Sequence, residues 1–187
     1  EAKAALKSMF EPEHFATVVH GDICPDNVFD NPEENKMALI DFEHSGVRSM
    51  FWDASYLRMN MPTCWYFASL PNKTIDDLDL VYRQKLSDSF PASLDDDLYG
   101  TAYTSAAAFW LLNIFRNVHN HLEDKGDLSN KGYSRVLSRI EAFITISQKY
   151  NKLLHLRKMA EIILERLKNK WPGVKPLEMF PAFMPSE

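Results

Sequence analysis

Three polar side chains have the types and the spacing that transfer of a phosphoryl group requires. Asp22 and Asn27 are five positions apart, and Asp41 follows fourteen positions later. Transfer to a hydroxyl needs a base that accepts the hydroxyl's proton and a metal ion that neutralises the phosphate charge. Mg²⁺ takes oxygen ligands, often including one or two carboxylates. These residue types predict Asp22 as the base and Asn27 with Asp41 as the metal ligands.

A short β-hairpin is the element that must bring these residues together. Short apolar runs at 28–29 and 37–40 flank a polar turn, which predicts a hairpin over residues 28–40. Such a hairpin would return Asp41 to the neighbourhood of Asn27. The metal ligands are therefore expected at the open end of the hairpin.

Helical periodicity dominates the rest of the chain. Two stretches resemble the capping box that opens a helix, one at 74–77 and one at 93–96. We expect the end of a helix in 1–13, a long helix from Leu94 to Leu122, two helices near 133–148 and 151–170, and a tail at 177–185 that lies against the helical body. The fold class predicted is α+β and mostly α-helical.

Length and composition set limits on the kind of protein. The chain has 187 residues and a net charge of −5, which fits a single soluble domain over 1–187 and excludes the basic face of a nucleic-acid-binding protein. It contains neither an apolar run of ~18 residues that could span a membrane nor the apolar segment of a signal peptide. Cys24 and Cys64 form no C-x-x-C pair, so we expect no zinc site and no disulfide, and a reducing, cytoplasmic setting.

The best-defined part of the sequence resembles a known family. The stretch His20-Gly21-Asp22-x-x-x-x-Asn27 resembles the catalytic loop of the protein-kinase-like fold, and its glycine is similar to that of the aminoglycoside phosphotransferase and choline kinase family. Asp41-Phe42-Glu43 occupies the position of the metal-binding motif of that fold. Asp53, twelve residues after Asp41, resembles the aspartate that braces the loop. The resemblance covers residues 17–60.

The resemblance implies a role for each matched residue. Asp22 would be the catalytic base, while Asn27 and Asp41 would bind Mg²⁺ and, through it, ATP. His20 and Asp53 would give structural support to the loop without touching the substrate.

The resemblance also implies a protein-kinase-like C-terminal lobe in which a small β-hairpin carries the metal site. Residues 1–60 would hold the catalytic loop and this hairpin, and 61–187 would form a helical subdomain on the acceptor side. Only nineteen residues precede His20, and the chain has no G-x-G motif. We therefore expect the N-terminal lobe to be absent here and to come from a longer chain or from another molecule. An uncovered lobe would expose apolar surface, which favours self-association.

The function implied is an ATP-dependent phosphotransferase that moves the γ-phosphoryl group to a hydroxyl of a small molecule. The alternative is a non-catalytic, pseudokinase-like binding module, which would use the same fold to hold a ligand or a partner protein. The sequence specifies neither the acceptor nor the choice between ATP and GTP.

Several other residues have simpler interpretations. We expect Asp26 to face solvent and Cys24 to be a small buried side chain. The aromatic segment 61–67 is interpreted as core packing, although aromatic faces can also hold a cationic substrate. A role for Glu43 near the metal stays open. His119 and His121 point to different sides of the expected helix, so they are a poor metal pair.

Overall fold

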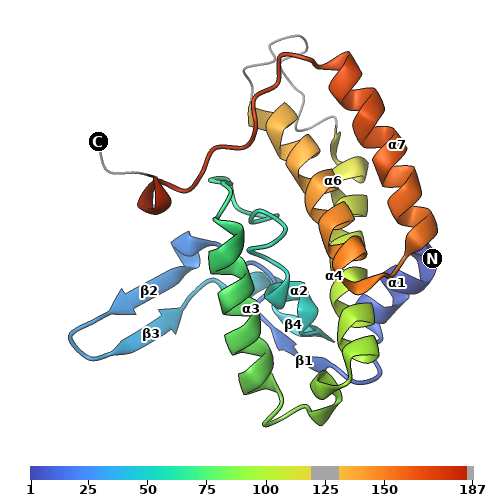
Figure 1. Ribbon diagram of the computed structural model, residues 1–187. Helices are drawn as coiled ribbons and strands as arrows, with labels where there is room; N and C mark the ends of the chain where they lie inside the picture. Colours follow the sequence, from blue (N-terminus) through green and yellow to red (C-terminus); the bar gives the residue numbers. More distant parts are fainter. Residues whose placement is uncertain (119–130, 185–187) are drawn as a thin grey trace.

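The computed structural model describes residues 1–118 and 131–184, and helices predominate in this part of the chain (Figure 1). The α-helices of the described residues are α1 (Ala2–Phe10), α2 (Phe51–Ala54), α3 (Asn72–Leu86), α4 (Asp96–Arg116), α6 (Lys131–Tyr150) and α7 (Leu154–Lys170). The strands are β1 (Ala16–Val19), β2 (Val28–Asn31), β3 (Lys36–Leu39) and β4 (Gly46–Ser49). The predicted α+β class is confirmed, and this mixture is compatible with the kinase-like fold that the resemblance implies.

The strands form two small antiparallel sheets. β2 pairs with β3, with Val28 opposite Leu39, which confirms the hairpin predicted over 28–40. This hairpin projects from the body of the molecule (Figure 1). β1 pairs with β4, with Val19 opposite Gly46. No sequence pattern predicted this second pairing, because it joins segments that lie on either side of the hairpin.

The core lies where α4 packs against its neighbours. α1 and α6 both contact α4, and α7 packs on α6 (Figure 1). Three consecutive alanines of α4, at 106–108, are fully buried, and small side chains allow helices to approach closely. Large aromatic side chains, including Phe51, Tyr103 and Trp110, fill the space around them. In the described part of the chain, no helix combines the length and the apolar character that crossing a membrane requires.

Both predicted capping boxes are wrong. α3 begins at Asn72, after Pro71, and no side chain caps it. Asp95 caps α4, because its carboxylate accepts hydrogen bonds from the backbone N–H groups of Asp97 and Leu98. Ser93 is instead buried in a short 3-10 helix, Pro91–Leu94. Both stretches offer several capping side chains close together, so the spacing alone does not decide between them.

The ends of two predicted elements differ from the structure. α4 ends at Arg116, before the expected Leu122, and residues 119–130 lie outside the described residues. The tail lies against the helical body, as predicted, and Lys131 of α6 forms an ion pair with Glu178 (2.9 Å). Met179 of the tail also forms a β-bridge with Ser69. The tail contains a short 3-10 helix, Pro181–Phe183.

Candidate active site

The loop that starts at His20 is held by Asp53. The backbone N–H groups of His20 and Gly21 donate hydrogen bonds to the Asp53 carboxylate, at 2.7 and 3.0 Å. Asp53 is fixed in turn, because it lies in the short helix α2 beside the buried Phe51 and Trp52. Burial raises the pKa of the Asp53 carboxyl, whereas the two backbone hydrogen bonds and the neighbouring charges act in the opposite direction. These backbone donors therefore offset part of the cost of burying the carboxylate.

The His20 side chain ties the loop to the end of β3. Its Nδ1 accepts a hydrogen bond from the backbone N–H of Asp22 (3.3 Å), so the other ring nitrogen carries the proton. This Nε2 donates to the carbonyl oxygen of Ile40 (2.8 Å), the residue before Asp41. The buried imidazole therefore connects the two segments that carry the predicted chemistry.

Position 21 requires glycine because of its backbone conformation and because a carbonyl group lies close to it. Its φ is +88°, in the region that side chains disfavour, and a Cβ would lie 2.4 Å from the carbonyl oxygen of His44. The carbonyl oxygen of Gly21 also accepts a hydrogen bond from the Trp52 indole (3.3 Å). No larger residue fits between the loop and the segment after Asp41.

Asn27 and Asp41 lie at the open end of the hairpin. The ladder of β2 and β3 continues beyond the strands, because the backbone N–H of Ile40 donates to the carbonyl oxygen of Asn27 (3.1 Å). The Asn27 side-chain amide donates to the Asp22 carbonyl oxygen (2.9 Å). Asp41 has a left-handed backbone (φ 63°), and its exposed carboxylate accepts no hydrogen bond from the described residues. Among the described residues, neither the Asn27 amide oxygen nor the Asp41 carboxylate accepts a hydrogen bond, and oxygen atoms of these two types are ligands that suit Mg²⁺.

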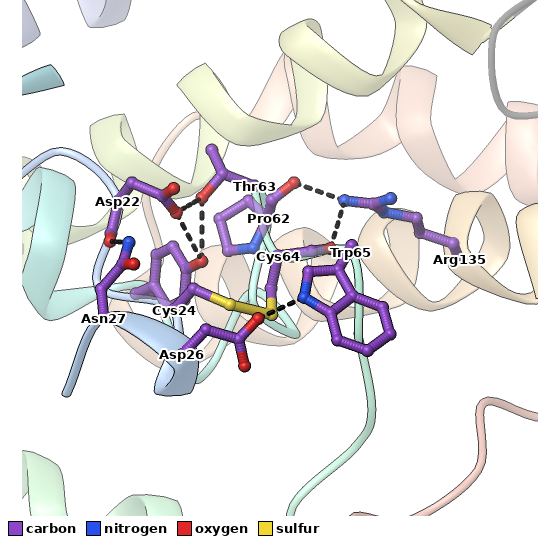
Figure 2. Close-up of a disulfide and its surroundings, with 10 residues drawn as sticks. Asp22, Cys24, Asp26, Asn27, Pro62, Thr63, Cys64, Trp65 and Arg135 are labelled. Carbon is purple, nitrogen blue, oxygen red and sulfur yellow. Dashed lines mark hydrogen bonds between the residues drawn. A yellow bond between two sulfur atoms is a disulfide. The ribbon is translucent and has the colours of Figure 1, made fainter. Parts of the chain in front are cut away.

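Asp22 is contacted by two hydroxyl groups (Figure 2). Its Oδ1 accepts hydrogen bonds from the Tyr56 hydroxyl (3.2 Å) and from the Thr63 hydroxyl. Sequence reasoning identified neither residue. Tyr56 had one available sign, since it follows Asp53 by three positions and so lies on the same side of a helical turn. Thr63 had none, because its approach depends on the path of a later loop.

Cys24 and Cys64 form a disulfide, with their Cα atoms 5.2 Å apart (Figure 2). The expectation of no disulfide was therefore wrong, because the two cysteines are 40 positions apart and only the fold brings them together. Cys24 is buried, as predicted. The two sulfur atoms and a carboxylate oxygen of Asp26 lie within 4.8 Å of one another, but the bridge already uses both sulfurs. The disulfide fastens the loop of Asp22 to the segment that follows α2.

That segment, 61–67, is only partly core. Met61 is buried, but Trp65 is 75% exposed, so the prediction of core packing was wrong for Trp65. Its indole N–H donates to the carboxylate of Asp26, which is exposed as expected but also has this partner. Arg135 of α6 holds the segment from behind, donating to the carbonyl oxygens of Pro62 (2.6 Å) and Cys64 (3.3 Å) (Figure 2).

A second arginine lies one helical turn further along α6. Arg139 is 1% exposed, and its Nε donates to the Met59 carbonyl oxygen (3.3 Å). Burial lowers its pKa to about 9, and the charge of Arg135 acts in the same direction. Both arginines therefore brace the backbone on either side of Asn60.

One residue whose role stayed open, Glu43, is not part of this arrangement. Glu43 is exposed, and its carboxylate lies 3.7 Å from Nε2 of His44. His119 and His121 lie outside the described residues.

This arrangement combines a braced loop, a carboxylate on that loop and an oxygen-rich hairpin end. The model of the phosphotransferase enzyme family, APH, matches residues 1–70, a segment that includes every residue of this site from His20 to Trp65. The match confirms the resemblance drawn from the loop and hairpin motifs, and it indicates a phosphotransferase-like function. The comparison with curated proteins found no match.

Proposed function

We propose that this chain is the C-terminal lobe of an ATP-dependent phosphotransferase that transfers the γ-phosphoryl group to a hydroxyl of a small molecule. One observation carries the proposal. Within the segment that matches the family, Asp53 fixes the backbone of the loop that holds Asp22, and the hairpin ladder returns the chain from Asn27 to Asp41.

The proposed mechanism assigns one step to each group. Asp22 orients the acceptor hydroxyl and takes its proton as the oxygen attacks the γ-phosphorus, whose bond to the β,γ-bridging oxygen breaks so that ADP leaves. Asn27 and Asp41 would hold Mg²⁺ through their side-chain oxygens, and the bound ion would neutralise charge on the phosphates of ATP. His20 and Asp53 keep the loop in place and do not contact the substrate.

The proposal includes an N-terminal lobe, supplied by a longer chain or by another molecule. Apolar side chains are exposed on both sheets and support this part of the proposal, namely Val18 (70%), Val47 (69%), Phe29 (57%) and Met37 (71%). A lobe that covers them would bury apolar surface, and self-association would be the other way to bury it. In this scheme residues 1–60 carry the loop and hairpin of one domain, and 61–187 form its acceptor side.

We further propose that the enzyme works in the cytoplasm, where ATP is supplied. The cytoplasm keeps most thiols reduced. In the cytoplasm, reductants could convert the disulfide between Cys24 and Cys64 into two free thiols. Activity should therefore be assayed with the disulfide intact and with the disulfide reduced.

Substitution of the two carboxylates tests the proposal in the chain together with any segment encoded upstream of it. Asp22→Asn should abolish phosphoryl transfer from Mg-ATP to a panel of aminoalcohols, sugars and aminoglycosides while leaving nucleotide binding intact. Asp41→Asn should instead weaken Mg-ATP binding in a calorimetric titration. Asp30→Asn, an exposed change on β2, is the matched control.

Two outcomes would count against the enzyme. If the Asp22→Asn variant still transfers the phosphoryl group, Asp22 is not the catalytic base. Binding of Mg-ATP without turnover of any acceptor, in the wild-type protein, would favour the pseudokinase-like module.

A further inference from the structure

One oxygen of the Asp22 carboxylate receives both hydroxyl contacts. Tyr56 and Thr63 approach the same atom, Oδ1, and they also contact each other, with the two hydroxyl oxygens 2.8 Å apart. Among the described residues, no hydrogen-bond donor reaches Oδ2.

We propose that Tyr56 and Thr63 are positioning residues for Asp22, which hold Oδ1 and leave Oδ2 to receive the proton of the acceptor hydroxyl. The proposal rests on the phosphotransferase function proposed above. It goes beyond that function by naming the atom that acts as the base and the two groups that direct it.

The proton count supports a directing role. The two hydroxyls have one proton each, yet three contacts join them with Oδ1. At any moment only two of the three contacts can be hydrogen bonds, and every arrangement that keeps both protons within these contacts leaves at least one hydroxyl donating to Oδ1. In each of these arrangements the carboxylate has a donor on this oxygen, which restricts movement of the Asp22 side chain.

Tyr56 is a fixed donor. Its side chain is fully buried, and its backbone N–H donates to the carbonyl oxygen of Asp53 (2.9 Å). Burial raises the pKa of the Tyr56 hydroxyl well above its usual value; the contact with Thr63 acts against this shift, and the charge of Asp22 adds to it. The phenol therefore stays protonated at neutral pH. The short stretch from Asp53 to Tyr56 contacts both the backbone of the loop and the carboxylate of Asp22.

Thr63 is exposed, so its position depends on its neighbours. On one side Pro62 accepts a hydrogen bond from Arg135 through its carbonyl oxygen. On the other side Cys64 is joined to Cys24, two residues after Asp22 in the chain. The threonine hydroxyl is therefore held between two anchors, one of which belongs to the loop that it contacts.

The effect on catalysis follows from orientation. An aspartate side chain that changes its Cα–Cβ rotamer carries the carboxylate out of alignment with the hydroxyl that it must orient. Displacement of a reacting group by about 1 Å can lower a rate by about 100-fold. Loss of either hydroxyl should therefore lower the rate of transfer, with little effect on the binding of ATP, because neither residue is placed at the metal.

The decisive variants are Thr63→Val and Tyr56→Phe, which remove a hydroxyl and keep the shape. Each should lower kcat at least about tenfold, within the range expected for a misplaced catalytic group, and leave the KM for ATP within about twofold of the wild type. Thr63→Ser should restore kcat, because it restores the donor. Thr145→Val, on the exposed side of α6, is the control for the loss of a threonine hydroxyl.

A second measurement does not depend on activity. Coupling constants that report the Asp22 Cα–Cβ torsion, measured by NMR on the 187-residue chain, should show a single rotamer in the wild type and averaging in both variants. A wild-type kcat in Thr63→Val together with an unchanged Asp22 rotamer would overturn the proposal. If Asp22→Asn keeps its turnover while the rotamer responds to Thr63→Val, the proposed enzyme fails but the positioning stands. If Thr63→Val does not fold, Tyr56→Phe carries the same test, with Thr63→Ser as the variant that keeps the donor.

Discussion

At residue 21 the backbone and a neighbouring carbonyl group together demand glycine. The positive φ alone would cost about 1–2 kcal/mol for a residue with a side chain. The carbonyl oxygen of His44, 2.4 Å from the position of a Cβ, adds a clash that only movement of the loop relieves. Gly21 therefore couples the loop of Asp22 to the segment that follows Asp41.

We expect Gly21→Ala to lower the free energy of unfolding by about 2 kcal/mol or more, since strain and clash add. Chemical denaturation measures the change. Gly46→Ala is the matched control, because Gly46 has no positive φ and its nearest contact to a Cβ is a flexible arginine side chain at 3.5 Å. Equal midpoints for Gly21→Ala and the wild type would show that the loop adapts and that the glycine is dispensable.

The residues that the sequence could identify are those fixed by spacing along the chain. Asp22, Asn27, Asp41 and Asp53 keep fixed distances in the motif. Thr63 could not be found in this way, because its contact with Asp22 needs the path of the segment after α2 and the bridge at Cys64. The spacing of Cys24 and Cys64 wrongly predicted no disulfide, because their pairing also depends on the path of the segment after α2.

At the scale of elements, a buried arginine joins the segment after α2 to α3. Arg58 is 9% exposed and donates to Asp79 through Nε (2.9 Å) and Nη2 (2.6 Å). The Tyr103 hydroxyl of α4 donates to the other oxygen of Asp79 (3.0 Å). Asp79 therefore links α3 to two other parts of the fold.

Asp79→Ala should lower the free energy of unfolding by about 3–5 kcal/mol, because it leaves the buried charge of Arg58 with only the more exposed Asp76. Asp77→Ala on the same helix removes only the exposed ion pair with Lys73 and should change stability little. Thermal and urea denaturation of both variants measure the difference. Equal losses would mean that the Arg58 network does not hold α3.

The sequence predicted these elements better than their ends. The hairpin at 28–40 and the helices near 133–148 and 151–170 follow from local patterns, because turn residues and periodic apolar residues act over a few positions. The start of α4 does not, because Ser93 and Asp95 are both good caps and tertiary packing buries the serine. The pairing of β1 with β4 is likewise a tertiary event.

At the scale of the whole molecule, the disulfide crosslinks residues 40 positions apart. A crosslink of this span reduces the freedom of the unfolded chain and contributes about 4 kcal/mol by the loop-entropy relation. Reduction should therefore move the urea midpoint to a lower concentration. The double variant Cys24→Ser/Cys64→Ser should unfold at the same midpoint in the presence and absence of reductant. A wild-type midpoint that does not respond to reductant would show that the bridge adds no stability.

The general architecture could be predicted from the sequence, but the connections across it could not. An α+β fold with a predominance of helix follows from the patterning of apolar residues. The bridge, the Arg58 network and the contact of the tail with Ser69 each join distant positions. These connections form only when the helices have packed, so no local sequence pattern predicts them.

The disulfide would keep the two parts of the chain covalently joined after a single cleavage between Cys24 and Cys64. The turn between β2 and β3 is exposed, and it lies between the two bridged cysteines in the sequence. A protease that cuts once in this turn would separate the peptide of Asp22 and Asn27 from the peptide of Asp41 and Asp53. The two pieces would nevertheless migrate as one molecule on a gel until a reductant released them.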